Sequence, residues 1–261
     1  MERGASINLR ITSRRSMFNL IHLVRPVARA VAATAILLTL AGCGAIVSSA
    51  PAPQVRVVTA SPDAPRLDIY QGSNPLAHNL GFGTITSYIP LSPGSDTIAA
   101  NTAGTRQLLS ISRMNFAASG QYTVLIGSAA ATMQQLTLTD QSQPAPQGQI
   151  ALRFLNQATR SGAVDIYLVP AGQKLTAVAP TVTNIPFGAN TGYLNIPAGA
   201  YSFVILPTAT VPPNSSLAVY NGSQVTYSSG SAHTIILIDQ QPTSAPGLQV
   251  ITASDFDPAT N

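Results

Sequence analysis

The 261-residue sequence contains a single cysteine, Cys43, and no tryptophan, and only 8% of its residues are charged. A lone cysteine has no partner within the chain, so intrachain disulfides cannot stabilise the fold. Glutamate occurs only at Glu2 and lysine only at Lys174. The chain also lacks a Gly-x-Ser-x-Gly elbow, a His-Glu-x-x-His zinc motif and a glycine-rich phosphate loop. These absences argue against the common hydrolase, zinc-enzyme and nucleotide-binding classes.

The N-terminal segment has the organisation of a bacterial lipoprotein signal peptide. Arginines scattered over residues 1–29 precede the apolar stretch 30–41, which has signal-peptide length and is short for a membrane span. The stretch ends in a lipobox, the motif at which the cysteine thiol is lipidated and the leader is removed. The lipobox residues are Leu40, Ala41, Gly42 and Cys43. We predict a signal peptide over residues 1–42 and a lipidated N-terminus with a tether over 43–53.

Three alternatives stay open for this segment. An internal start at Met17 would shorten the basic part, and Arg14-Arg15 resembles a twin-arginine signal. The uncharged stretch 30–47 could also remain as an uncleaved membrane anchor. Both a lipoprotein and an anchor place the rest of the chain outside the cytoplasm. We expect a lipid-anchored protein of the bacterial cell envelope, with the outer membrane favoured because Gly44, rather than aspartate, follows the lipidated cysteine.

Removing the leader changes the sign of the net charge. The full chain has 13 Lys+Arg and 9 Asp+Glu, for a formal net charge of +4. Six arginines and Glu2 lie within residues 1–42, so residues 43–261 keep seven basic and eight acidic side chains. A chain with a net charge near −1 offers no basic surface for nucleic acid. We therefore expect no nucleic-acid partner, and contact with the membrane through the N-terminal lipid.

Short alternating segments predict an all-β fold. Segments such as 55–58, 67–70 and 122–126 are rich in Val, Ile, Leu and Tyr and are separated by turns containing Pro, Gly or Asn. No apolar pattern at helical spacing continues over three turns. The pattern is typical of sandwiches or barrels, and we predict tandem β-sandwich domains of the Ig-like or prealbumin-like kind.

An internal duplication sets the number of domains. Residues 55–70 align without a gap with residues 152–167, and residues 82–94 align with 187–199. The offset between the copies grows from 97 to 112 along the chain, and each increase falls in turn-like sequence, where insertions are tolerated. Pairs shared by the copies are Arg56 and Arg153, Asp68 and Asp165, Tyr70 and Tyr167, Thr86 and Thr191, and Tyr88 and Tyr193.

The duplication divides the remainder of the chain. We predict β-sandwich domain 1 over 54–142, a linker over 143–148, β-sandwich domain 2 over 149–252 and a tail over 253–261.

The first copy resembles a known family. The sequence VRVVTASPDAP at 55–65, running into LDIY at 67–70, resembles the opening of a bacterial domain of unknown function, family 4397 (DUF4397). Phe82-Gly83 and Tyr88 resemble the next block of that family. The second copy resembles it more weakly. The resemblance implies an extracytoplasmic β domain, often found on lipoproteins, and it implies no reaction.

The repeated aspartate and tyrosine allow two interpretations. Asp68 and Asp165 each lie between apolar strand residues, two positions before Tyr70 and Tyr167. The pair could contact a ligand on the sheet surface. Alternatively, the carboxylate ties down a loop through backbone N–H groups, with the tyrosine half buried beside it. We favour the structural interpretation, because a bond that defines the fold recurs in both copies whatever the ligand. The repeated arginines could pair with these carboxylates across adjacent strands.

Candidates for chemistry are few. His78 lies in a turn-rich stretch and His233 in an apolar segment, where we expect it to pack within a strand. Asp255 and Asp257 approach a calcium-loop pattern, but we expect them to be solvated in the tail. We predict no catalytic residue, no metal ligand and no cofactor. The favoured function is a non-enzymatic envelope module that binds polysaccharide or protein, or acts as a scaffold. The alternative is an envelope polysaccharide or peptide hydrolase with an unrecognised site.

Overall fold

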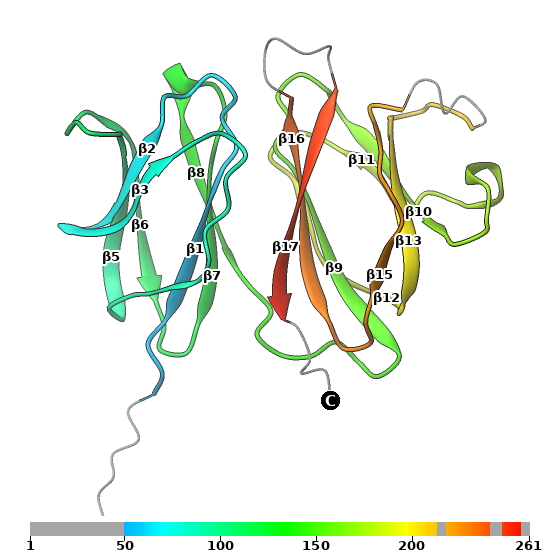
Figure 1. The fold of residues 1–261 in the computed structure, drawn as a ribbon, viewed down its shortest axis with the longest axis horizontal. Helices are drawn as coiled ribbons and strands as arrows, with labels where there is room; N and C mark the ends of the chain where they lie inside the picture. Colours follow the sequence, from blue (N-terminus) through cyan, green and yellow to red (C-terminus); the bar gives the residue numbers. More distant parts are fainter. Residues whose placement is uncertain (1–49, 213–217, 241–246, 257–261) are drawn as a thin grey trace, which may run out of the picture. The chain divides into compact units, whose positions relative to one another are not determined.

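The computed structural model describes residues 50–212, 218–240 and 247–256, and residues 50–261 form one compact unit. The predicted signal peptide and the lipobox at residues 40–43 lie outside the described residues. None of the helices in the described part of the chain is long and apolar enough to cross a membrane. The prediction of two tandem all-β sandwich domains is confirmed (Figure 1).

The first sandwich consists of two four-stranded sheets, with strand orders β4-β1-β7-β8 and β3-β2-β5-β6. We call the sheet that contacts the other sandwich the inner sheet, here β4-β1-β7-β8, and the remaining one the outer sheet. The elements are β1 (Gln54–Thr59), β2 (Leu67–Gln71), β3 (Asn74–Leu80), β4 (Ile89–Pro90), β5 (Gly94–Thr102), β6 (Leu108–Phe116), β7 (Gln121–Gly127), the 3-10 turn η1 (Ala130–Thr132) and β8 (Gln134–Thr139).

The second sandwich repeats this arrangement. Its inner sheet has the order β12-β9-β16-β17, and its outer sheet has the order β11-β10-β13-β14, with β15 also paired to β13. The elements are β9 (Gln149–Asn156), β10 (Val164–Pro170), the 3-10 turn η2 (Leu175–Ala177), β11 (Val182–Ile185), β12 (Asn190–Pro197), β13 (Gly199–Pro207), β14 (Tyr220–Asn221), β15 (Val225–Tyr227), β16 (Ala232–Asp239) and β17 (Leu248–Phe256).

Both inner sheets contain a parallel pair between strands that are distant in sequence. β1 pairs in parallel with β7, and β9 pairs in parallel with β16. Parallel partners need a long crossover connection, and in each sandwich the chain forms the outer sheet between them. The same unusual pairing in both sandwiches agrees with the duplication seen in the sequence.

Successive residues of a strand point to opposite faces of the sheet, and in the inner sheets both faces carry apolar side chains. In β1, Val55 and Val57 pack in the core of the first sandwich, together with Leu67 and Ile69 of the outer sheet. Val58 points the opposite way and is nevertheless fully buried. The inner sheet is therefore covered on both faces, as the near-continuous apolar sequence VRVV requires.

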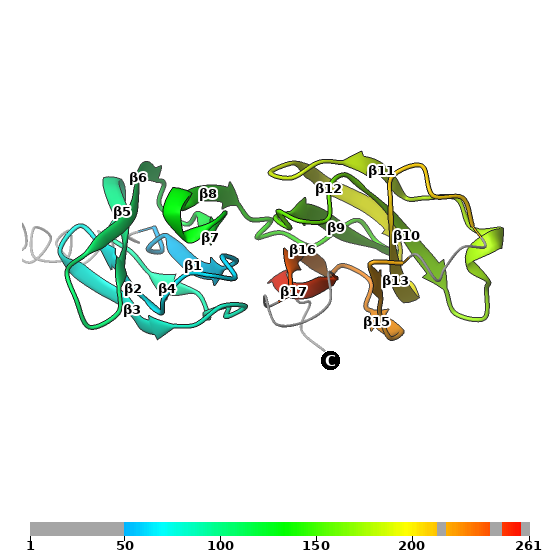
Figure 2. The same cartoon turned by 90° about the horizontal axis from the view of Figure 1, so that it is seen from above.

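The second face of each inner sheet packs against the other sandwich (Figures 1 and 2). One apolar cluster spans both sheets, and its buried members are Val58, Ala60, Leu125, Leu138, Leu155, Ile236, Ile238 and Ile251. Burying one such large aliphatic side chain contributes about 1.5–3 kcal/mol. The two sandwiches are thus joined by apolar burial as well as by the connecting segment.

The last strand corrects the predicted end of domain 2. β17 continues to Phe256, four residues beyond the predicted boundary at residue 252. Asp255, which we expected to be solvated in a tail, is 5% exposed. That expectation is wrong, because residues 248–256 pair with β16 and complete the inner sheet of the second sandwich. Asp257 and the rest of the predicted tail lie outside the described residues.

Candidate functional site

A buried polar site in the first sandwich surrounds Arg56 on the inner sheet. The guanidinium of Arg56 lies 4.9 Å from the ring centre of Tyr88, and its Nε donates to Thr123 Oγ1 at 2.8 Å. Thr123 and Tyr88 both donate their hydroxyl hydrogens to Asp140 Oδ2, at 2.6 and 2.8 Å. These four residues form one connected hydrogen-bonded group that we call the inner cluster.

The second sandwich contains the same inner cluster. Arg153 lies 4.6 Å from the ring centre of Tyr193, and its Nε donates to Thr234 Oγ1 at 3.0 Å. Thr234 and Tyr193 both donate to Asp255 Oδ2, at 2.7 and 2.8 Å. These four contacts of the first cluster therefore have counterparts in the second, whereas the 3.6 Å approach of Arg56 Nη2 to Asp140 Oδ2 belongs to the first cluster.

The two inner clusters exchange their ion pairs across the contact between the sandwiches. Arg56 of the first sandwich pairs with Asp255 of the second, and Arg153 of the second pairs with Asp140 of the first at 2.5 Å. The arrangement has the reciprocity of an isologous dimer interface, in which residue i of one copy contacts residue j of the other and the reverse. The expectation that the repeated arginines pair with Asp68 and Asp165 is wrong.

Burial decides the electrostatics of the inner clusters. Desolvation raises the pKa of Asp255 despite the neighbouring charge of Arg56. Desolvation also raises the pKa values of the Tyr88 and Tyr193 hydroxyls, and the adjacent carboxylates add to this effect. Arg56 and Arg153 are only 2% and 3% exposed, whereas Tyr88 and Tyr193 are partly exposed, so the charged groups of the clusters are buried between the sandwiches.

Asp68 and Asp165 lie in the outer sheets, where both accept backbone hydrogen bonds. Asp68 Oδ1 accepts the N–H of Asn79 at 2.8 Å and its Oδ2 accepts the N–H of Gly104 at 2.9 Å. These two bonds hold the pKa of Asp68 below its usual value. Asp68 thereby braces both the β2–β3 hairpin and the loop that connects β5 to β6.

Asp165 makes the equivalent contacts in the second sandwich. Its Oδ1 accepts the N–H of Asn184 at 2.7 Å, and its Oδ2 accepts the N–H of Ala209 at 3.3 Å. The role of Asp68 and Asp165 in stability stays a prediction, but their geometry is that of a loop anchor in both copies.

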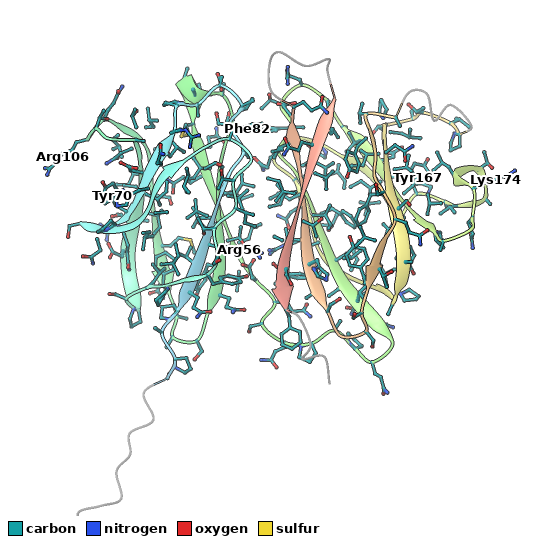
Figure 3. All side chains as sticks on the ribbon, viewed as in Figure 1. Arg56, Tyr70, Phe82, Arg106, Tyr167 and Lys174 are labelled. Carbon is teal, nitrogen blue, oxygen red and sulfur yellow. The ribbon has the colours of Figure 1, made fainter. Side chains whose placement is uncertain are left out.

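Tyr70 and Tyr167 are in contrasting environments, although they occupy equivalent positions. Tyr167 is 4% exposed and packs in an apolar cluster on the outer face of its sheet. The cover comes from residues 171–181, which carry η2 and contribute Leu175 and Val178. In the first sandwich β2 and β3 are joined by residues 72–73 alone. Tyr70, labelled on β2 in Figure 3, borders an open pocket.

The pocket beside Tyr70 has a volume of about 290 Å³. It lies on the outer face of the outer sheet, over β2, β5 and the loops at their ends. The lining residues are Tyr70, Gly72, Ser73, Ala99, Asn101 and Arg106. The volume is close to the lower limit of about 300–1,000 Å³ for small-molecule sites, which suits a single ring or one unit of a polymer.

A family model for a domain of unknown function, DUF4397, matches residues 53–167 and 171–261. The chain belongs to the DUF4397 family. The first match continues through β9 and most of β10, so the matched segments and the two sandwiches have different boundaries. Among curated proteins, none matches this sequence.

Two solved structures of carbohydrate-binding modules resemble the DUF4397 chain at low similarity. Family 41 modules from streptococcal virulence factors, described as recognising α-glucan, share 10% identity at a TM-score of 0.25, with 70% of this chain and 93% of that chain covered. A family 26 module from Eubacterium rectale in complex with maltoheptaose also shares 10% identity at a TM-score of 0.25, with coverage of 79% and 97%. At this level they carry no argument about function.

The two histidines in the described part of this DUF4397 chain lie in different sandwiches, His78 in β3 and His233 in β16. His78 Nδ1 lies 3.4 Å from Asp68 Oδ1, and the ring contacts Tyr70 edge-on at 6.0 Å. His233 lies in β16, 5.2 Å from the Tyr227 ring. In the described ranges no group of three His, Cys, Asp or Glu side chains could hold a metal ion.

Several functional positions were missed by sequence reasoning. Asn79 and Asn184 share the offset of 105 and adopt left-handed backbone angles of φ 57° and 54°. They are the partners of the repeated aspartates, and asparagine tolerates that conformation better than most residues. Strand register also places Asn101 opposite Asp68, and Leu206 opposite Asp165. A polar residue in one copy therefore stands where the other copy has an apolar one, a contrast that becomes visible only once the strand register is known.

Proposed function

We propose that the protein is a lipid-anchored, non-enzymatic binding protein of the bacterial cell envelope that holds envelope polysaccharide on the outer sheet of its first sandwich. The observation that carries this proposal is the contrast between the outer faces. One is closed by the chain itself, whereas the other presents a pocket and exposed apolar side chains.

The exposed face has the mixture of groups that a sugar requires. Paired strand positions form a row from Tyr70 through Ala99 to Ile111, and Ile111 is 55% exposed. A second row runs from Asn101 to Leu108, which is 51% exposed. Sugar rings present C–H groups beside hydroxyls, so an aromatic and aliphatic surface bordered by amide and guanidinium groups complements them.

The covered face of the second sandwich supports the same conclusion. Val204 and Leu206 occupy the positions of Ala99 and Asn101 there, and both are buried beneath the 171–181 segment. A face that stays covered carries large apolar residues, because burial stabilises them. The smaller and more polar residues of the first sandwich suit a face that exchanges solvent for a ligand.

The lipid at Cys43 supplies the location. Stable anchoring needs more than one acyl chain, at about 0.8 kcal/mol per buried CH₂ group, and lipoprotein processing provides several chains on one cysteine. The segment 44–53 then links the anchor to β1. Cys43→Ser is expected to leave the precursor uncleaved or released from the membrane, and normal membrane retention of that variant would contradict the anchor.

The test is co-sedimentation of the full-length lipidated protein with insoluble polysaccharide prepared from its own envelope. Ile111→Ser, on the open face, is expected to reduce the bound fraction at least fivefold. Val225→Ser is the matched control, since Val225 is an exposed valine (46%) in the outer sheet of the second sandwich. Equal binding by all three proteins would overturn the proposed site. Release of soluble sugar during the incubation would favour the hydrolase alternative.

A further inference from the structure

We infer that the pocket at Tyr70 selects a sugar that carries a carboxylate. This inference rests on the proposed function and names the class of sugar that the first sandwich holds. Three side chains that line the pocket lead to it: Tyr70, Asn101 and Arg106.

The aromatic wall is Tyr70. Its neighbours in sequence, Ile69 and Gln71, are buried, and Tyr70 itself is partly exposed on the outer face. The edge-on contact with His78 supports one side of the ring and leaves the pocket side free of that contact. An aromatic ring held in this way offers a flat surface to the C–H face of a sugar.

The floor carries a hydrogen-bond acceptor that has no partner. Asn101 Oδ1 is buried and accepts no hydrogen bond within the described residues. Leaving such an acceptor unpaired costs about 1–3 kcal/mol. The terminal torsion of asparagine is soft, so a small rotation brings this oxygen to a hydroxyl donor of a sugar seated in the pocket. The equivalent Leu206 has no polar atom to satisfy.

The rim carries a positive charge. Arg106 is exposed, lines the pocket and makes no ion pair or hydrogen bond within the described residues. Arg113 is exposed on the same face, opposite Thr97 of β5. Guanidinium groups bind carboxylates through paired, charge-assisted hydrogen bonds. A carboxylated sugar could form an ion pair with Arg106, whereas a neutral sugar could not.

Neither Asp68 nor Asp96 forms an ion pair with Arg106 within the described residues. Asp68 is occupied by the backbone N–H groups of Asn79 and Gly104, and Asp96 accepts the N–H of Thr97 at 2.7 Å. The bond from Gly104 to Asp68 also fixes the β5–β6 loop that bears Arg106. Asp68 is therefore a positioning residue for the arginine rather than a competitor of the ligand.

The experiment is a calorimetric titration of the full-length protein in detergent with four soluble probes. Trigalacturonate and N-acetylmuramic acid carry carboxylates on different parts of the sugar and distinguish a uronate polymer from the glycan of the cell wall. Carboxyl-reduced trigalacturonate and N-acetylglucosamine are the corresponding neutral probes. We expect at least one acidic probe to bind about tenfold more tightly than its neutral counterpart, because charge-assisted hydrogen bonds are about twice as strong as neutral ones.

Variants locate the effect. Arg106→Gln should remove the preference for the acidic probe, Tyr70→Ala should weaken both members of a pair, and Lys174→Gln, on the covering segment of the second sandwich, should change neither. Equal affinity for acidic and neutral probes would overturn the carboxylate inference while leaving the polysaccharide proposal intact. Failure of all four probes would also overturn it. Loss of envelope co-sedimentation by the wild-type protein would overturn the proposed function itself.

Discussion

The outer sheets of the two sandwiches carry the same sequence pattern, but their outer faces differ in exposure to solvent. Both contain the Asp-x-Tyr pattern, at Asp68 and Asp165, and both use the aspartate to hold two loops. The tyrosine of the second sandwich is covered by residues 171–181, whereas the tyrosine of the first borders a pocket. A short insertion between two strands therefore separates a structural face from a candidate binding face. The two copies share the role of the aspartate, which anchors loops, and they differ in the surroundings of the tyrosine.

The inner sheets show the opposite behaviour. There the arginine, tyrosine, threonine and aspartate of each copy make equivalent contacts and exchange their ion pairs. Each cluster supplies the carboxylate that pairs with the arginine of the other cluster, so a substitution in one cluster also affects the other. The two copies therefore keep equivalent contacts in the inner sheets, where the sandwiches meet, and differ on the outer faces of the outer sheets.

The largest expected effect comes from breaking one crossed ion pair. Asp255→Ala removes the nearer of the two carboxylates beside the buried Arg56, whose Nη2 also lies 3.6 Å from Asp140 Oδ2. Removing one member of a buried pair costs about 3–5 kcal/mol. Asp140→Ala should cost a similar amount through Arg153. Urea unfolding followed by circular dichroism measures both losses. A loss below about 1 kcal/mol for either variant would show that the reciprocal pairs do not hold the sandwiches together.

Replacing Tyr167 should lower the free energy of unfolding more than replacing Tyr70. Tyr167→Ala empties a buried site, and such large-to-small changes of aromatic residues cost about 3–5 kcal/mol. Tyr70→Ala removes a partly exposed ring and should cost about 1 kcal/mol or less. The free energy of unfolding of each variant provides the comparison. Equal losses would mean that the two outer faces are packed alike, against the contrast described above.

The aspartates should again respond alike, with a smaller effect. Asp68→Ala and Asp165→Ala each leave two backbone N–H donors without their acceptor. The four donor residues are exposed, so water can take the place of the carboxylate, and we expect a loss of about 1 kcal/mol for each variant. Only Asp68→Ala should also weaken ligand binding, because it frees the loop that carries Arg106. If both variants have the parental melting temperature while binding is lost, Asp68 belongs to the site rather than to the fold.

The smallest effect is a dependence of stability on pH. The pKa of Asp68 is lowered by the N–H groups of Gly104 and Asn79. A carboxyl with a lower pKa in the folded state stabilises the fold above its unfolded value of about 3.9, and this contribution is lost as pH falls through the folded pKa. The stability difference between the parent and Asp68→Asn should therefore be present at pH 6 and shrink below about pH 4. A difference that stays constant down to pH 2 would contradict the role of the ionised carboxylate.

The sequence was sufficient for the features that local patterns determine. Alternation and turn residues predicted strands, and the spacing of Asp68 and Asp165 exposed the duplication. The crossed pair between Arg56 and Asp255 could not be predicted, because it depends on which faces of two sheets meet. Val58 gave a partial signal, because it lies two positions after Arg56, on the face opposite Val55 and Val57, and apolar residues on both faces of a strand indicate burial of both faces.

The pocket was also beyond sequence reasoning. The increase in offset from 97 to 105 marks the insertion that covers Tyr167, but it does not show which face the inserted residues cover. Asn101 and Leu206 become equivalent only through strand register, because the strands that carry them share few residues.

Hydrogen–deuterium exchange of the full-length protein, with and without its native envelope polysaccharide, tests the central claim most directly. The account predicts slower exchange in β2, β5, β6 and the loop at residues 103–107, with β10 and β13 of the second sandwich unchanged. Slower exchange confined to the second sandwich, or no change at the β5–β6 loop, would contradict the assignment of the open outer face as the binding site.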